Sequence, residues 1–341
     1  MSELDEVKKY AREMGIALED VIYPALDTHL RKAGGIEFIE NIGEIPTVMI
    51  EDAFDPESPY LKGYRTRFYG WSDGKVVFRP NELTVWTGYN GHGKTQFVNQ
   101  LALEMIDNGA KVCIASLEMS KRVLIRRLFK QASGLTVPTP GYLHAIRQHY
   151  SHKLFLFDHL GAIDQRKLLN AFKEVLEIYG VDVFIIDSLM KCGILEDDYN
   201  AQKLFIDMLC DFKFAHRCHI HLIAHPRKGM HENGAPGKMD IKGTGTITDL
   251  ADNAFSVWRN KPKEAYLANN PNDEEEKKKA DAVVYCNKQR NGDWEGQLHL
   301  WYHRGCYQFL QSYGAKPNEY VKYDQRQDTL DYLRSIPDLQ G

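Results

Sequence analysis

The chain has 341 residues, 43% of them hydrophobic and 26% charged, and a formal net charge of −4. This is the composition of an ordinary globular protein with enough apolar residues for a sizeable core. The small negative charge excludes a uniformly basic nucleic-acid-binding protein, so such binding requires a local patch or an assembled ring. No apolar run approaches the about 20 residues that span a bilayer. The six cysteines are scattered without a C-x-x-C pair, which favours free thiols in a reducing compartment.

The first 62 residues differ from the rest of the chain. Short helices are expected over Glu3–Met14 and Leu18–Lys32, followed by a linker over Gly43–Tyr60 that is rich in proline and acidic residues. The segment holds too few apolar residues for a core of its own. Two interpretations stay open: a cap packed on the main domain, or a helical arm that docks on a neighbouring subunit.

A phosphate-binding loop is predicted at Gly88–Thr95, which reads Gly-Tyr-Asn-Gly-His-Gly-Lys-Thr and fits G-x-x-x-x-G-K-[ST]. An apolar strand is expected before it, over Glu82–Gly88, and a helix after it, from Lys94 to about Asn108. The glycines let backbone N–H groups converge on a phosphate, the lysine adds charge for the β- and γ-phosphates, and the threonine hydroxyl suits Mg²⁺. The alternative is a glycine turn before a core helix. The predicted nucleotide-binding residues here are Gly88, Gly91, Gly93, Lys94, Thr95 and Gln96, with Thr95 also at the metal.

Strands and helices alternate from about residue 63, which predicts an α/β fold: a mostly parallel sheet flanked by crossover helices. Helices are expected over residues 120–134, 164–180, 202–214 and 246–253. Residues 266–279, with four acids followed by three lysines, predict a solvated surface insertion. The domain is expected to span 63–313, followed by a polar, partly disordered tail at 314–341. The further expected strands are Lys111–Leu117, Lys153–Asp158, Val181–Asp187, His219–His225, Phe255–Arg259, Asp281–Cys286 and Gln297–His303.

Several predicted strands end in residues suited to nucleotide chemistry, and ligands of open parallel sheets bind at these carboxyl ends. Val183–Asp187 reads Val-Phe-Ile-Ile-Asp, a Walker B pattern whose apolar residues bury the strand and deliver Asp187 to Mg²⁺. The alternative is an aspartate that caps the next turn through Ser188. Glu118 ends the strand after the loop helix, where a carboxylate can orient and deprotonate an attacking water. The alternative is a surface glutamate that starts a helix.

Three further cations or imidazoles lie at predicted strand ends. His225 is placed to bond the γ-phosphate and sense its loss; the alternative is a core or capping histidine. Lys288 and Arg290 follow a strand and suggest charge placed near a phosphate, plausibly across a subunit boundary, because an arginine finger stabilises charge that develops in the transition state. The alternative is a pair of solvated basic residues at a hairpin.

A glycine-containing basic loop is predicted over Pro226–Gly245. Its cations and flexibility suit contact with the backbone of single-stranded nucleic acid without sequence reading. The alternative is a floppy surface loop. The predicted DNA-binding residues are Arg227, Lys228, Lys238 and Lys242.

In their order, these motifs resemble the RecA-like hexameric replicative helicases. They are most similar to the helicase half of phage primase–helicases and of Twinkle, which is related to DnaB-type helicases. The resemblance covers about Thr66 to Phe309 and rests on the phosphate loop with its strand and on five further segments. These are Ser116-Leu-Glu-Met-Ser120, Phe184-Ile-Ile-Asp-Ser-Leu189, Ile223-Ala-His-Pro-Arg-Lys228, Lys242-Gly-Thr-Gly-Thr-Ile-Thr-Asp-Leu-Ala-Asp252 and Asn287-Lys-Gln-Arg-Asn-Gly292.

The resemblance implies a RecA-like P-loop NTPase core with a short N-terminal helical arm. It also implies that Lys94 and Thr95 bind nucleotide and Mg²⁺, that Glu118 is the catalytic base and that Asp187 is the Walker B acid. These roles agree with the chemistry expected from the residues themselves.

Five more roles follow from the resemblance. His225 would couple the γ-phosphate to the DNA loop that follows it. Arg290, with Lys288 beside it, would be the finger supplied to the adjacent subunit. Arg259 and Tyr302 match positions that hold the nucleotide base.

The implied protein is a ring-forming DNA helicase, expected to be a hexamer. It would hydrolyse ATP or another NTP or dNTP with Mg²⁺ and translocate 5′→3′ on single-stranded DNA in replication. A primase or polymerase is a further expected partner, and no membrane is expected. The acidic N-terminus carries no apolar signal, so the cytoplasm of a bacterial or phage-infected cell is the expected location.

Residues 1–62 depart from the full primase–helicases. Leu18–Asn41 resembles the end of a primase domain, and the zinc and primase modules themselves have no counterpart, so primase activity is expected to be absent. Two alternatives stay open. One is a RecA-class DNA-dependent ATPase or recombinase that forms filaments without unwinding. The other is a non-catalytic prophage remnant that acts as a binding module.

Overall fold

The computed structural model describes residues 45–55, 58, 62–72, 74–194, 198–225 and 245–324. The chain forms two units that divide between Ser58 and Pro59. In the first unit the described element is helix α3 (Thr47–Phe54), which lies inside the segment predicted to be a linker. The helix was not predicted there, although Thr-Val-Met-Ile-Glu-Asp-Ala-Phe contains no glycine or proline to break one. The two helices predicted before it lie outside the described residues.

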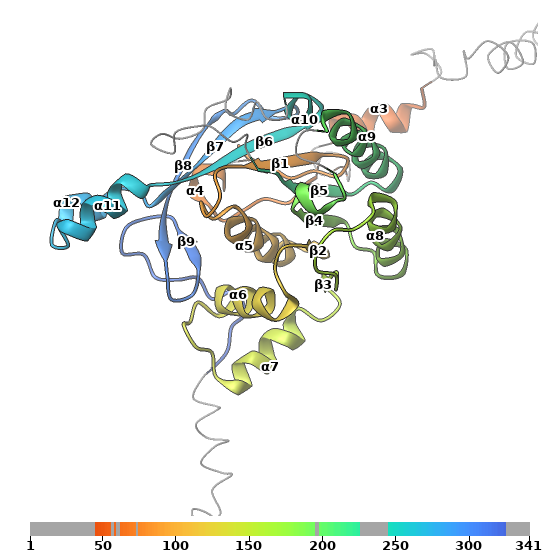
Figure 1. Ribbon diagram of the computed structural model, residues 1–341. Helices are drawn as coiled ribbons and strands as arrows, with labels where there is room; N and C mark the ends of the chain where they lie inside the picture. Colours follow the sequence, from red (N-terminus) through yellow and green to blue (C-terminus); the bar gives the residue numbers. More distant parts are fainter. Residues whose placement is uncertain are drawn as a thin grey trace, which may run out of the picture. The chain divides into compact units, whose positions relative to one another are not determined.

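The second unit is built on a sheet whose described strands run in the order β3-β2-β4-β5-β1-β6-β7-β8-β9. The strands from β3 to β6 in this order pair in parallel, and β7, β8 and β9 add in antiparallel fashion at one edge. The predicted, mostly parallel α/β sheet is therefore confirmed (Figure 1). The strands are β1 (Leu83–Thr87), β2 (Val112–Ser116), β3 (Leu154–Leu156), β4 (Val183–Asp187), β5 (His219–Ile223), β6 (Asn253–Arg259), β7 (Ala282–Gln289), β8 (Gly296–His303) and β9 (Gln308–Leu310).

Helices cover both faces of this sheet. On one face lie α5 (Lys94–Asp107), α6 (Lys121–Ser133) and α7 (Pro140–His149), which Figure 1 shows on the same side. Helices α8 (Gln165–Tyr179), α9 (Tyr199–His216) and α10 (Gly245–Leu250) cover the other face. The short helix α4 (Tyr69–Ser72) precedes β1, a 3₁₀ turn (Leu189–Lys191) follows β4, and α11 (Lys261–Asn269) and α12 (Glu274–Lys278) lie between β6 and β7.

The central strands are buried on both sides. Alternate residues of one strand point to opposite faces, so Trp86 and Ile185 join the apolar cluster on the α5 side while Val85 and Phe184 join the cluster on the α8 side. Every residue of β1 and β4 is buried. This burial explains why these strands read as continuous apolar runs rather than as alternating ones.

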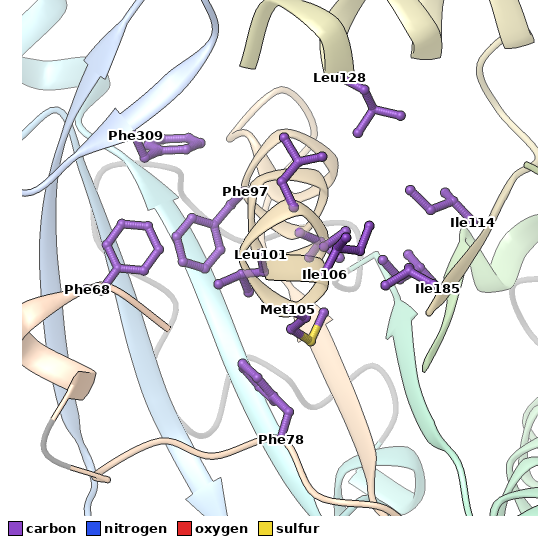
Figure 2. Packing of buried hydrophobic residues seen from close by; sticks show 14 of the residues in the cluster. Phe68, Phe78, Phe97, Leu101, Met105, Ile106, Ile114, Leu128, Ile185 and Phe309 are labelled. Atoms are coloured by element: carbon purple, nitrogen blue, oxygen red, sulfur yellow. The ribbon is translucent and has the colours of Figure 1, made fainter. Parts of the chain in front are cut away.

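Helix α5 forms the centre of the larger cluster. Its apolar residues recur every fourth position, and Figure 2 shows Phe97, Leu101 and Met105 directed into the packing around it. The ring of Phe97 is fully buried between Phe68, with centroids 5.4 Å apart, and Phe309, at 5.6 Å. Removing such a buried ring costs about 3–5 kcal/mol, so this cluster fixes the helix that carries the phosphate loop at its start.

Three structured segments differ from the predictions. Helix α7 was not predicted, although its start carries a local signal: Thr139 accepts a hydrogen bond from the N–H of Tyr142, and Pro140 is the first helical residue. The expected solvated insertion at 266–279 is helical, with the end of α11 and all of α12, and no residue of α12 is buried. Strand β9 was also missed, because three residues are too few to show a period.

The segment expected to be a polar tail is packed into the domain over its described part, residues 314–324. Tyr320 and Val321 are buried, and the Tyr320 hydroxyl donates to Glu104 Oε1 at 2.9 Å. Two anchoring residues in a polar stretch give little sequence signal. The domain was therefore expected to end at 313, although packed residues continue beyond that position. Among the described helices, none is long and apolar enough to cross a membrane.

Candidate active site

Four functional candidates, the phosphate loop, Glu118, Asp187 and His225, meet at the carboxyl ends of the central strands, here called the carboxyl edge of the sheet. In the register, Ser116 of β2 lies opposite Asp187 of β4, Asp187 lies opposite Ile223 of β5, and Trp86 of β1 also lies opposite Ile223. The carboxyl ends of these strands are therefore level. The segments that follow these strands therefore lie close together, and they contain the phosphate loop, Glu118, the 3₁₀ turn and His225.

The glycines of the phosphate loop are required by its backbone. Gly88 has a φ of 140°, and a Cβ there would lie 2.2 Å from the carbonyl oxygen of Val257. Gly93 has a φ of 91° and precedes the first residue of α5. Its missing Cβ would lie 3.0 Å from the ring of Phe309. Other residues would be strained or would clash here, so the loop and β6 are built to pack closely.

Lys94 lies inside the loop. Its Nζ donates to the carbonyl oxygens of Gly88 at 2.6 Å and Tyr89 at 3.2 Å. Burial lowers the pKa of Lys94 to about 8, because desolvation of the ammonium outweighs the opposing effect of the Asp187 and Glu118 carboxylates. The carbonyl oxygens carry only partial negative charge, so an anionic phosphate in the loop would stabilise the ammonium group more strongly.

Thr95 and Asp187 form the candidate metal site. The Thr95 hydroxyl donates to Asp187 Oδ2 at 2.9 Å, and Asp187 is buried, which raises the pKa of its carboxyl group to about 6. Mg²⁺ takes oxygen ligands and is usually held by one or two protein groups together with phosphates and waters. A hydroxyl and a buried carboxylate in contact fit that donor set. Among the described residues, no group of three or more His, Cys, Asp or Glu side chains is arranged to hold a metal ion.

Glu118 is held by two hydrogen-bonding partners. Its Oε1 lies 3.2 Å from His225 Nε2 and also accepts a hydrogen bond from the Ser188 hydroxyl. The contact with His225 is the largest cause that lowers the pKa of Glu118 to about 2, and Ser188 lowers it further. A carboxylate with so low a pKa is a weak base, and removal of His225 would raise its basicity. Ser188 was predicted only as an alternative capping partner of Asp187, and its contact with Glu118 was not expected.

A cavity of about 650 Å³ opens beside the phosphate loop. It is lined by residues that include five of the predicted nucleotide-binding set: Gly91, Gly93, Gln96, Arg259 and Tyr302. Its volume is in the range of small-molecule sites. The Gln96 amide donates to the carbonyl of Tyr307 at 3.1 Å, so this side chain also supports the cavity wall.

Arg259 is held in the cavity wall by contacts that the sequence did not predict. Its Nε and Nη2 each donate to the carboxylate of Glu264 at 2.6 Å, and its Nη1 donates to the carbonyl of Gly91 at 3.3 Å. Its backbone N–H donates to His92 Nδ1 at 3.0 Å. The end of β6, the start of α11 and the phosphate loop are thus joined at one residue. Glu264 gave no motif signal, because its role depends on the turn of α11 that brings it back to Arg259.

Arg290 lies at the amino ends of the central strands, here called the amino edge of the sheet. Its N–H donates to the carbonyl of Asp252 at 2.8 Å, and its Nη1 lies 3.0 Å from Asp252 Oδ1. Asp252 Oδ2 accepts the N–H of Leu83 at the start of β1, whereas Lys94 follows the end of that strand. A five-residue strand spans about 16 Å, so Arg290 does not reach the phosphate loop of its own subunit.

Lys288 lies at the same edge, inside β7, which runs to Gln289 and so extends past the predicted end at Cys286. Its Nζ donates to the carbonyl oxygens of Asp249 at 2.8 Å and Ala251 at 2.7 Å. These contacts tie β7 to the segment after α10. The predicted DNA-binding residues Arg227, Lys228, Lys238 and Lys242 lie outside the described residues.

Comparisons with known proteins agree with this geometry. A family model described as an AAA domain (AAA_25) matches residues 74–230. A Twinkle homologue, chloroplastic/mitochondrial, from Arabidopsis thaliana is 24% identical over 244 residues, which cover 63% of this chain and 34% of that protein. The chain therefore spans about a third of the length of this curated relative.

Two solved structures share the fold. One is an ATPase domain, which aligns with a TM-score of 0.63 and 17% identity, covering 78% of this chain and 96% of that one. The other is a DnaB-like replicative helicase, solved in a study of its interactions with primase. It aligns with a TM-score of 0.64 and 17% identity, covering 89% of this chain and 76% of that one. The expected RecA-like ATPase core is confirmed.

Proposed function

We propose that this chain, a RecA-like ATPase domain of the DnaB and Twinkle type, functions as a ring-forming DNA helicase. It hydrolyses ATP or another NTP or dNTP and translocates on single-stranded DNA in replication. The observation that carries the proposal is the meeting of Lys94, Thr95, Glu118, Asp187 and His225 at one sheet edge beside a nucleotide-sized cavity.

The residues at this edge divide the work of hydrolysis. Lys94 exchanges its carbonyl contacts for the β- and γ-phosphates. Thr95 and Asp187 would hold Mg²⁺, which when bound would neutralise charge on the phosphates. Glu118 orients a water and takes its proton as the water oxygen bonds to the γ-phosphorus. The bond from that phosphorus to the β–γ bridging oxygen breaks, and the nucleoside diphosphate leaves with the electron pair.

His225 keeps this base weak until nucleotide is present. Its Nε2 contacts Glu118 in the structure, and a γ-phosphate offers the same nitrogen a more strongly charged acceptor. Departure of His225 raises the pKa of Glu118 toward its ordinary range, so the base becomes effective only when substrate is bound. Loss of the γ-phosphate returns His225 to Glu118. The residues that follow His225 are those proposed to contact DNA, which links the two events.

Assembly into a ring, with six subunits implied by the family resemblance, is supported by the position of Arg290. Because Arg290 contacts Asp252 beside the start of β1, whereas Lys94 lies beyond the end of that strand, its guanidinium can assist hydrolysis only in a neighbouring subunit. Movement in the 5′→3′ direction and contact with a primase or polymerase belong to the same proposal.

Nucleotide hydrolysis with and without single-stranded DNA tests the proposal. A translocating motor hydrolyses faster on DNA, and fork unwinding accompanies hydrolysis. Electron microscopy separates rings from filaments. Equal rates with and without DNA would contradict a motor, filaments without unwinding would favour a recombinase, and no hydrolysis would favour a binding module.

A further inference from the structure

Asp252 is the centre of a charged group at the amino edge of the sheet. Its side chain is 4% exposed. Oδ2 accepts a hydrogen bond from the Lys213 ammonium and another from the N–H of Leu83 at 2.7 Å. Oδ1 lies 3.0 Å from Arg290 Nη1. Lys213, from α9, is 1% exposed. A buried cation therefore already balances the charge of Asp252 before Arg290 is counted.

Arg290 differs from its two partners in exposure and in unused donors. Its side chain is 49% exposed. Among the described residues, its side chain forms one ion pair, through Nη1, although a guanidinium carries five N–H donors. Two cations around one carboxylate leave a net positive charge. Asp252 thus fixes the direction of Arg290 without neutralising the group. Within the part of the chain that the structure describes, the other guanidinium donors form no ion pair, which suits contact with an anion outside the subunit.

Stability does not explain this arrangement. A buried ion pair is often no more stable than apolar residues of similar volume, because desolvating both charges offsets their attraction. Lys288 adds a second tie, through the carbonyls of Asp249 and Ala251. The end of β7 is thereby held against the segment that carries Asp252 at two separate points.

We propose that Asp252, anchored by Lys213, is a positioning residue that aims Arg290 at the nucleotide of the neighbouring subunit. The inference rests on the proposed function, in which Arg290 acts across a subunit boundary. It adds the parts that orient the finger: a buried aspartate, a buried lysine from α9 and the first N–H of β1.

The double variant Lys213→Met with Asp252→Asn tests this role without leaving a buried charge unpaired. The Asn oxygen can accept the N–H of Leu83, which turns its amide donors toward Arg290 and releases the guanidinium. Lys213→Met removes the anchor but keeps the pair between Asp252 and Arg290, so it is the intermediate variant of the series. Lys203→Met, an exposed change on the same helix, is the matched control.

We expect DNA-stimulated hydrolysis to fall roughly 100-fold in the double variant, since a misaligned catalytic group costs about that much. Lys213→Met should lose less activity than the double variant, because the pair between Asp252 and Arg290 remains while its anchor is removed, and Lys203→Met should match the wild type. Nucleotide affinity, measured with a fluorescent analogue, should be unchanged, because the altered edge is remote from the cavity. Mixing the double variant with Lys94→Ala should restore activity at the interfaces where an intact loop meets an intact finger.

Wild-type hydrolysis in the double variant would overturn the proposal. So would a loss that mixing does not restore, once co-assembly has been verified, because the defect would then lie in the variant's own site. If the double variant does not fold, Asp252→Glu replaces it: it keeps the charge for Lys213 and displaces the contact with Arg290. Arg290→Ala calibrates the series, since full activity in that variant would overturn the proposed function itself, separately from the role of Asp252.

Discussion

The two edges of the sheet carry buried charge in different ways. At the carboxyl edge, Lys94 hydrogen-bonds to carbonyl oxygens and Asp187 to a hydroxyl group, and burial moves the pKa of each toward its neutral form. At the amino edge, Asp252 and Lys213 are paired with each other. The carboxyl edge therefore needs a charged ligand to satisfy its groups, whereas the amino edge is satisfied internally and presents one half-exposed arginine outward.

Lys94→Ala is expected to have the largest effect on activity. Hydrolysis should fall roughly 1,000-fold or more, because the charge that stabilises the phosphates is lost. The melting temperature without nucleotide should stay the same or rise, since a desolvated ammonium is removed. Parallel hydrolysis and thermal unfolding measurements check both expectations. A marked loss of stability would show that this lysine is structural, and the contrast between the edges would fail.

Glu118→Gln should reduce turnover by roughly 100- to 10,000-fold, because general base catalysis contributes about that much. Nucleotide affinity should persist, since the loop and the metal ligands are intact. Single-turnover hydrolysis and an equilibrium binding titration separate the two effects. Near-normal hydrolysis would remove Glu118 from the mechanism.

The charge state of Asp187 should make stability depend on pH. Its folded pKa of about 6 lies above the unfolded value of 3.8, so the folded state binds the proton more tightly. Stability from this group is greatest below about pH 4 and falls as pH rises through 6, by about 3 kcal/mol in total. Asp187→Asn should therefore stabilise the nucleotide-free protein at pH 7.5 and lose that advantage near pH 4. Thermal unfolding at the two pH values measures this, and an equal effect at both would contradict it.

Glu264→Gln should have the smallest effect, confined to nucleotide binding. The pair with Arg259 is partly exposed, at 41% and 31%, so its loss is worth about 1 kcal/mol, or about fivefold in affinity. The turnover number should persist, because the phosphate loop is unchanged. Glu275→Gln, whose partner Lys278 lies on the surface, is the matched control. An unchanged affinity would show that the cavity wall does not bind the base.

The parts of the fold that the sequence predicted are those with strong local patterns. Strands β1 and β4 are continuous apolar runs, and α5 has an apolar residue at every fourth position next to a motif with a known backbone. Helix α11 lacks such a pattern, because its buried residue is Lys263, which is satisfied by carbonyl oxygens and Asp281. The described tail residues are held by Tyr320, whose partner Glu104 is far away in sequence.

The candidate site was predictable where chemistry follows directly from a strand end. Asp187 and Glu118 are delivered by the strands that precede them, and the pairing of those strands brings them together. Ser188, Glu264 and Asp252 were missed as parts of sites because their roles depend on turns and on contacts between distant strands. Neither the composition nor the spacing of residues in a sequence indicates which carboxylate will pair with which cation in the fold.

The central claim is that the two edges of the sheet form one active site between neighbouring subunits. Hydrolysis by a mixture of Lys94→Ala and Arg290→Ala, each inactive by itself, tests it most directly. DNA-stimulated activity is expected to return on mixing, at interfaces that combine an intact loop with an intact finger. No recovery in rings proven to contain both variants would contradict it.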